Sequence, residues 1–173
     1  MFLKKLKPNE VQKALDRIAN YYRNDPLFVQ YANAEDAYDY YIKMYGPSIE
    51  KLIGYGMSFS YKNNYLIAFD FKEVMKQDSA LIDYLFKIVP GLIPFVEREP
   101  EDVIWIFAFG PESEVIGKNG YKLLNAFINE YDNDYVILTD CMESRDVDTF
   151  KRSTSMHKIL LNGEVYFRCG MEE

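Results

Sequence analysis

The segment from Phe107 to Leu124 holds the residues whose types and spacing most clearly indicate chemistry. It reads FAFGPESEVIGKNGYKLL, in which an apolar run ends at Gly110-Pro111 and a loop containing residues 117–120 (GKNG) leads into helical spacing. Unpaired backbone N–H groups and the positive end of the helix dipole meet where such a loop enters a helix. Glycine lets the backbone come close to a ligand. The segment therefore suits an anion such as a pyrophosphate, and a simple tight turn is the alternative interpretation.

The rarer side chains argue against a metal site. Cys141 and Cys169 lie far apart and belong to no CxxC pair, and His157 is the only histidine of the sequence. A thiolate zinc site needs closely spaced cysteines, and a histidine cluster needs several histidines. We therefore expect no metal, and we expect both cysteines to be thiols, as is usual in a reducing compartment.

Length and charge limit the classes of protein further. The chain has 173 residues, and 20 Lys plus Arg against 27 Asp plus Glu give a net charge of −7. The length predicts a single domain over residues 1–173. The acidic balance argues against a nucleic-acid partner, because phosphate binding needs a basic face. The most apolar stretch, residues 81–96, contains Asp83, Lys87 and two prolines, and no signal-peptide pattern occurs. We expect a cytoplasmic protein without a membrane partner, and the oligomeric state stays open.

Helical spacing dominates the first third of the chain. A helix is expected to start at the Asn9 cap and to end at Asn24-Asp25-Pro26. Tyr38, Tyr41 and Tyr45 lie on one face of a second helix that should end at Gly46-Pro47, and a further short helix should close at Gly54. The tyrosine stripe is predicted to face the core.

The rest of the chain alternates strands and helices. Alternating apolar residues predict an antiparallel hairpin of strands 57–61 and 65–71, and a helix capped by Asp78 or Ser79 should follow. Residues 103–109 and 135–139 read as strands buried on both faces, and a helix lies between them. A short helix near residues 147–150 precedes a hairpin of strands 156–161 and 164–169 around Asn162-Gly163. The order predicts a mixed α/β sheet with a parallel centre, antiparallel edges, helices on both faces and a C-terminal β-hairpin.

In this order the motifs resemble those of the GNAT superfamily of acyl-CoA-dependent N-acyltransferases. The run 107–111 (FAFGP) resembles the family's strand end, residues 117–120 resemble its pyrophosphate loop, and Leu123-Leu124 resemble its helix start. Downstream, residues 138–140 (LTD) resemble the next strand and residues 146–150 (DVDTF) resemble the "N-V-x-x-Y" helix. The segment 24–28 (NDPLF) resembles an "xDPLF" segment of some members. The resemblance spans about residues 9–170.

The resemblance implies a GNAT-like fold and transfer of an acetyl or other acyl group from acetyl-CoA or acyl-CoA directly to an amine. Asp140, at a strand end, is the candidate base acting through water, and Asp70 is a second candidate. A backbone N–H near Phe109 would polarise the thioester carbonyl. The residues that the resemblance assigns to acyl-CoA binding are Phe107, Phe109, Gly117, Lys118, Asn119, Gly120, Asp146 and Phe150.

The sequence departs from the family pattern in the loop and in the last helix. The loop is one residue longer, so either Gly117 or Gly120 aligns with a family glycine, and Glu114 or Val115 opens the loop where the family has Arg or Gln. Phe150 stands where many members carry a tyrosine, and a phenyl ring cannot act as a general acid. Three classes therefore stay open: an active N-acyltransferase, a catalytically degenerate GNAT-fold protein that serves as a CoA-binding or protein-interaction module, and an unrelated α/β domain.

The segment 24–42 bears on the acceptor. It contains Asp25, Glu35, Asp36 and Asp39 and neither lysine nor arginine. In the family, the early helices help to shape the acceptor site. The segment therefore suggests a cationic acceptor, such as a small amine or a lysine side chain of a peptide, and a solvated acidic helix face is the alternative.

Overall fold

The computed structural model describes residues 3–25, 29, 36–88, 102–139, 147–161 and 164–170. The strands form one sheet in the order β1-β2-β3-β4-β5-β7-β6, in which β4 and β5 are parallel and every other neighbouring pair is antiparallel. The strands are β1 (Lys4–Lys5), β2 (Phe59–Tyr61), β3 (Asn64–Asp70), β4 (Val103–Gly110), β5 (Val136–Thr139), β6 (His157–Leu161) and β7 (Glu164–Cys169). The helices are η1 (Pro8–Glu10), α1 (Val11–Arg23), α3 (Ala37–Ile53), α4 (Phe71–Gln77), α5 (Ser79–Ile88), α7 (Lys118–Tyr131) and α8 (Val147–Ser153).

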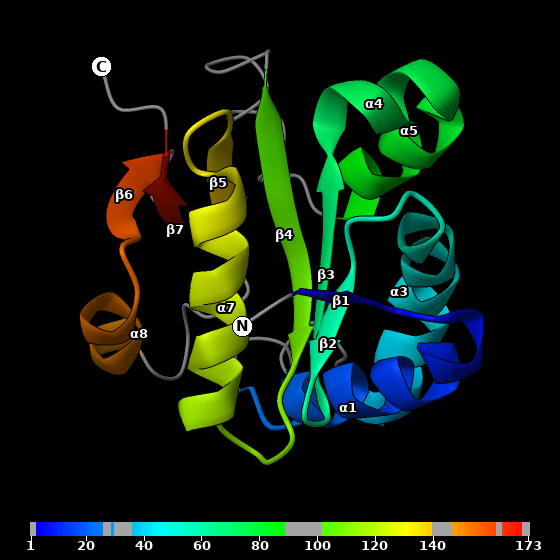
Figure 1. Ribbon diagram of the computed structural model, residues 1–173. Helices are drawn as coiled ribbons and strands as arrows, with labels where there is room; N and C mark the ends of the chain where they lie inside the picture. Colours follow the sequence, from blue (N-terminus) through cyan, green and yellow to red (C-terminus); the bar gives the residue numbers. More distant parts are fainter. Residues whose placement is uncertain are drawn as a thin grey trace.

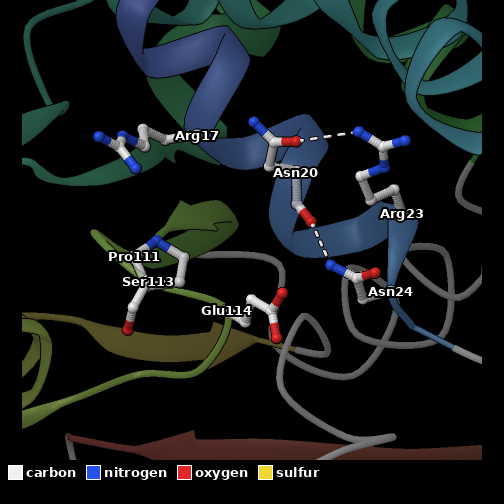
Figure 2. A pocket seen from close by; sticks show the side chains of 7 residues that line it. All are labelled: Arg17, Asn20, Arg23, Asn24, Pro111, Ser113 and Glu114. Carbon is white, nitrogen blue, oxygen red and sulfur yellow. Dashed lines mark hydrogen bonds between the residues drawn. The ribbon is translucent and has the colours of Figure 1, made fainter.

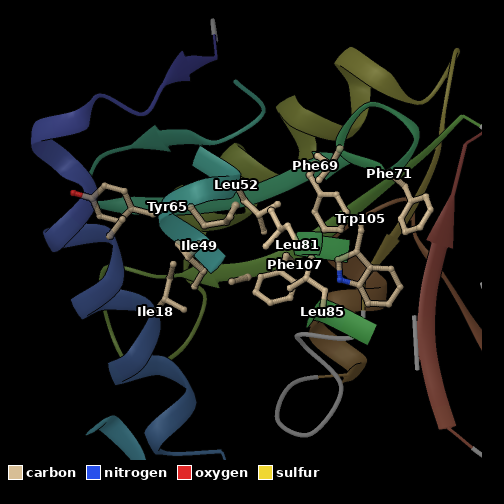
Figure 3. Close-up of a cluster of buried hydrophobic side chains, with 14 of the residues drawn as sticks. Ile18, Ile49, Leu52, Tyr65, Phe69, Phe71, Leu81, Leu85, Trp105 and Phe107 are labelled. Carbon is tan, nitrogen blue, oxygen red and sulfur yellow. The ribbon is translucent and has the colours of Figure 1, made fainter. Parts of the chain in front are cut away.

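Helices cover both faces of the sheet, as Figure 1 shows: α7 lies to the left of β4, and α1, α3, α4 and α5 lie to the right. The two faces enclose separate apolar clusters. Phe69, Trp105 and Phe107 point into the cluster shared with α1, α3 and α5, part of which is drawn in Figure 3. Phe109 and Phe127 belong to the cluster under α7. Both faces of β3 and β4 are therefore buried, which explains their nearly continuous apolar sequences.

The mixed sheet, the parallel centre and the two antiparallel hairpins confirm the fold class predicted from the sequence. The strands of the C-terminal hairpin, however, do not follow chain order in the sheet. Its second strand, β7, pairs with β5, and β6 lies outside it.

The early helices differ from the prediction. Helix α3 runs unbroken from Ala37 to Ile53 with Pro47 inside it, so the predicted stop at Gly46-Pro47 was wrong. Tyr41 before the proline and Ile49 after it are buried in the same cluster, so the apolar stripe stays in phase. Burial of that face offsets the backbone hydrogen bond that a proline removes. A second difference is η1, which precedes α1, so that Glu10 rather than Asn9 is the N-cap of α1.

Two short elements lacked a clear sequence pattern. Strand β1 has two residues and pairs with β2, and α4 begins directly after β3. Asp70 ends β3 and caps α4, because its carboxylate accepts the N–H of Glu73 at 3.2 Å. The predicted cap of α5 is confirmed, since Asp78 accepts the N–H of Leu81 at 3.1 Å. In the part of the chain that the structure describes, no helix is long and apolar enough to cross a bilayer.

Candidate active site

Strand β4 extends beyond its parallel partner. The pairing of β4 with β5 ends at Ile106 and Thr139, whereas β4 continues to Gly110 and stays paired with β3 over those last residues. The Thr139 hydroxyl donates to the Ile106 carbonyl oxygen at 3.0 Å, which satisfies this backbone group where the ladder ends. On the β5 side, residues 107–110 have no strand partner within the described residues. As far as the described residues extend, an extended ligand can pair with this edge.

A β-bulge lies at the start of this edge. Ile67 pairs with Ala108 and Ala68 with Ile106, so Phe107 is an extra residue opposite β3. A bulge changes which face the following side chains occupy. Here Phe107 points into the cluster on the α1 side and Phe109 into the cluster under α7. Both rings are buried, so only the backbone of these two predicted binding residues can contact a ligand.

The N-terminus of α7 lies beyond the end of β4. Gly117 is its N-cap, with extended backbone at φ −99°, and a Cβ added there would meet no atom within 4 Å. Lys118, the first residue of the helix, is exposed. Open space, backbone N–H groups and a positive side chain at one helix end suit an anionic group such as a phosphate.

Gly120 has a different role. A Cβ at this position would lie 2.8 Å from Ile116 Cγ2 and 3.2 Å from Asn64 Oδ1. The first turn of α7 therefore packs closely against the hairpin of β2 and β3. Of the two glycines that compete for alignment with the family loop, Gly117 borders open space and Gly120 serves packing. The Asn119 amide donates to the Glu112 carboxylate at 3.4 Å and so contacts the loop itself.

The loop between β4 and α7 is held at Glu112 by residues far away in the sequence. The buried Asn64 accepts the Glu112 N–H on its Oδ1 at 3.1 Å, and it donates its amide to the carbonyls of Tyr61 and Lys62 at 3.0 and 3.1 Å. The Arg17 guanidinium donates to the Glu112 carbonyl at 3.0 Å. Hydrogen bonds thus hold both the backbone N–H and the backbone carbonyl oxygen of Glu112. Neither Asn64 nor Arg17 was predicted from the sequence, since nothing in the chain order connects them to this loop.

Two hollows flank the loop, one on each face of the sheet. The first, of about 410 Å³, lies between α1 and the loop and is drawn in Figure 2; we call it the α1-side cavity. It is lined by Arg17, Asn20, Arg23, Asn24, Pro111, Ser113 and Glu114. The second, of about 930 Å³, runs along α7, and we call it the α7 groove. Its lining includes Lys118, Tyr121, Lys122, Asn125, Tyr61 and Ser153.

The predicted residues of the last helix do not all reach the site. Phe150 is 1 % exposed, and its ring packs 4.7 Å from Phe167 and 6.3 Å from Tyr121, measured between ring centroids. It is therefore a core residue. Asp140 and Asp146 lie outside the described residues, so their roles stay predictions.

Asp70 lies at the wrong end of the sheet to act as the base. It pairs with Ile104 near the start of β4, caps α4 and accepts the Tyr135 hydroxyl at 3.1 Å. Burial and the negative charge of Asp70 raise the pKa of Tyr135 above its ordinary value. Our prediction of Asp70 as an alternative base was thus wrong, since Gly110 and the loop lie at the other end of β4.

Aromatic side chains connect α1 and α3 to the bulge. Tyr22 stacks on Tyr41 at 4.9 Å, Tyr41 on Tyr45 at 4.7 Å, and Tyr45 lies 6.2 Å from Phe107. Tyr41 is buried, as predicted, whereas Tyr38 is partly exposed and donates its hydroxyl to Asp16 at 2.8 Å. This hydrogen bond is the main reason why the pKa of Tyr38 is raised.

No family model matches the sequence, and no curated protein matches it. Among solved structures, the chain is similar to the C-terminal condensation domain of Ebony in complex with beta-alanyl-dopamine, with a TM-score of 0.63 and 11% identity over 97% of this chain and 96% of that one. It is also similar to an N-acetyltransferase from Staphylococcus aureus Mu50, with a TM-score of 0.53 and 14% identity over 98% of this chain and 99% of that one. At these identities the likeness shows the fold alone. The chain thus has a GNAT-type fold, as its sequence resemblance predicted.

Proposed function

We propose that this protein is an N-acyltransferase that moves an acetyl or related acyl group from acyl-CoA to an amine. The observation that carries the proposal is the edge of β4, which continues past its pairing with β5 and ends beside the open N-terminus of α7. An extended amide chain can add to such an edge as a strand would. The pantetheine arm of CoA is a chain of this kind, and its phosphates would then lie near Gly117 and Lys118.

The α7 groove supports this placement of the donor. Lys118 and Lys122 lie one turn apart at its N-terminal end, and the ring of Tyr121 lines it between them. Two ammonium groups near a helix N-terminus favour anionic groups.

The chemical step needs little more than positioning. The acceptor nitrogen bonds to the thioester carbonyl carbon, the carbon–sulfur bond breaks and the CoA sulfur leaves as a thiolate. The nitrogen loses one proton and the thiolate gains one; an acceptor that arrives as an ammonium ion releases a further proton to water. Asp140, which directly follows Thr139, is our candidate base through water. Backbone N–H groups of β4 near Phe109 are the candidates for polarising the carbonyl, and holding both reactants together supplies much of the rate.

The second candidate function is a non-catalytic CoA-binding or protein-interaction module. The burial of Phe150 favours it, because the position that carries a phenol in many family members here offers only a packed phenyl ring. The hydroxyl oxygen of Tyr121, whose ring packs against Phe150, is buried as well, so it does not replace the missing phenol.

Acidic side chains near α3 support a cationic acceptor. Asp16 accepts the Tyr38 hydroxyl, Asp36 caps α3, and Asp39 lies in its first turn. These carboxylates and the stacked tyrosines lie on the α1 face of the sheet, away from the α7 groove. An amine that is protonated in water would be attracted to this face before it loses its proton.

The test combines binding with turnover. Acetyl-CoA should raise the melting temperature, and free CoA should do so less strongly; ATP is the control for nonspecific phosphate binding. Lys118→Glu combined with Lys122→Glu should weaken acetyl-CoA binding, whereas Lys76→Glu on α4 should not. Thiol release in an amine panel then separates the two candidates: binding with turnover supports the transferase, and binding without turnover supports the module. No binding at millimolar acetyl-CoA would overturn the transferase and the CoA-binding module, and would leave the protein-interaction module.

A further inference from the structure

The α1-side cavity concentrates hydrogen-bond donors in an acidic protein. Arg17 and Arg23 contribute two guanidinium groups, and Glu114 contributes one carboxylate, so the charged lining residues sum to +1. The whole chain carries −7. Asn20 and Asn24 add side-chain amides. A local excess of positive charge on a negative molecule favours an anionic group at this place.

Contacts within the protein hold both guanidinium groups in position. Arg17 is partly buried and donates to the Glu112 carbonyl at 3.0 Å. Arg23 donates to Asn20 Oδ1 at 3.3 Å, and its guanidinium carbon lies 5.6 Å from the centroid of the Tyr38 ring. Each guanidinium carries five N–H donors, so one contact leaves others for a ligand. Holding these side chains in place beforehand lowers the entropy lost on binding.

The cavity also lies where an acceptor would be needed. Its floor is Pro111, directly after the last residue of β4. Helix α1 comes this close because residue 110 is glycine: a Cβ there would lie 2.8 Å from the Ile18 backbone nitrogen. Helices α1 and α7 lie on opposite faces of the sheet (Figure 1), so a donor along α7 and a ligand in the α1-side cavity would approach the end of β4 from opposite sides.

We propose that the α1-side cavity binds an anionic group of the acceptor, so that the acceptor is an amine that also carries a carboxylate or a phosphate. This inference rests on the proposed transferase function and narrows its substrate class. Arg17 and Arg23 hold the anion, which suits the planar guanidinium. Glu114 supplies one opposite charge to the same lining and favours the ammonium end of a zwitterion. The volume of about 410 Å³ matches a small molecule of amino-acid size rather than a protein surface.

The first experiment compares acceptors that differ in one group. Phenylalanine, phenylalanine amide and phenethylamine form one series, and O-phosphoethanolamine with ethanolamine forms the other. We expect kcat/KM to be at least about tenfold higher for the amine that bears the anion, as one charge-assisted hydrogen bond would give. The series in which the anion raises kcat/KM more shows whether the cavity prefers a carboxylate or a phosphate. Equal or higher kcat/KM for the amines that lack the anion would overturn the proposal.

The second experiment uses variants. Arg23→Met should remove the advantage of the anionic acceptors, so that their kcat/KM falls towards that of phenethylamine and ethanolamine. Arg23 is exposed at the end of α1, so folding is not at risk. Arg17→Lys should act in the same direction, and Lys76→Met is the matched control. An equal loss with every acceptor would indicate a structural role and contradict the proposal.

A third readout does not depend on turnover. Arginine side-chain N–H signals are followed by NMR while inorganic phosphate, acetate or phenylalanine is added. Shifts that saturate in the wild type and disappear in Arg23→Met support the cavity as an anion site; no saturable shift overturns it. If such shifts occur but acetyl-CoA neither binds nor reacts, the transferase function fails while the anion site stands, so the two failures are distinguishable.

Discussion

Asn64 and Glu112 are 48 residues apart, yet the side-chain oxygen of Asn64 accepts the backbone N–H of Glu112 at 3.1 Å. This contact ties the turn between β2 and β3 to the loop between β4 and α7. Asn64 is fully buried, and each of its two polar groups has a backbone partner. The position of the candidate phosphate loop therefore depends on a residue that itself does not line the site.

Replacing Asn64 by alanine should loosen the loop. The substitution leaves the Glu112 N–H and the carbonyls of Tyr61 and Lys62 without their protein partner, so we expect the free energy of unfolding to fall by about 1–3 kcal/mol. Urea denaturation measures this. For acetyl-CoA, KM should rise more than kcat falls. Asn133→Ala, at an exposed asparagine, is the control, and an unchanged KM in Asn64→Ala would contradict the role of the contact.

Alanine at the two loop glycines should affect different properties: stability at Gly120 and acetyl-CoA binding at Gly117. Gly120→Ala places a Cβ 2.8 Å from Ile116 Cγ2 and should lower the free energy of unfolding by about 1–3 kcal/mol. Gly117→Ala meets no atom within 4 Å, but alanine is a poorer N-cap than glycine, so the free energy of unfolding should fall by about 0.5–1 kcal/mol. The added methyl group should also weaken acetyl-CoA binding. Thermal melts with and without acetyl-CoA give both quantities, and the reverse pattern would show that Gly120 is the ligand-facing glycine.

Phe150→Tyr restores the family's phenol but should not restore function. The side chain is 1 % exposed among Phe167 and Tyr121, so the new hydroxyl should be buried and should lower the free energy of unfolding by about 1–3 kcal/mol. Turnover per folded molecule should stay the same. An increase in kcat would mean that position 150 reaches the thioester after all.

Alkaline pH should destabilise the fold partly through Tyr135. Burial first, and then the negative charge of Asp70, raise the pKa of this tyrosine in the folded state. The folded protein therefore holds the phenol proton more tightly than the unfolded chain does. The resulting stabilisation is complete below pH ~10 and is lost as pH rises from there through the raised pKa.

The measurement is urea denaturation at pH of about 8 and about 11. Tyr135→Phe should lose less stability between the two pH values than the wild type does. Asp70→Asn should also reduce the loss, because it removes the charge that raises the pKa. If both variants follow the wild-type pH dependence, then Tyr135 does not contribute to it.

The sequence predicts those parts of the fold whose patterns are local. Strand β4 reads as a continuous apolar run because both of its faces are buried, and the hairpin of β2 and β3 shows alternation and turn residues. The sequence also predicts the transition from β4 to α7, because the change from a continuous apolar run to helical spacing is local. Local patterns gave a wrong or incomplete prediction where contacts distant in sequence decide the structure. Helix α3 continues through Pro47 because its buried stripe stays in phase. Helix α4 is short, and its start depends on one capping residue, Asp70.

The candidate site is less predictable than the fold. Gly117 and Lys118 belong to a contiguous motif and could be found in the sequence. Arg17, Arg23 and Asn64 lie in segments that only the folded sheet brings to the loop, and Asn64 looks like an ordinary turn residue in the sequence. Phe107 and Phe109 were correctly predicted as strand residues. Their spacing of two residues predicts that both rings lie on one face of the sheet, whereas the bulge places them on opposite faces.

The interior position of β7 has a consequence for the order in which the sheet can be completed. Until residues 164–169 dock, β5 has an unpaired outer edge, because β7 and not β6 is its neighbour there. Slow docking or loss of this one strand would therefore expose an apolar strand edge in the middle of the sheet and detach β6 with it, and such unpaired edges are places from which aggregation starts.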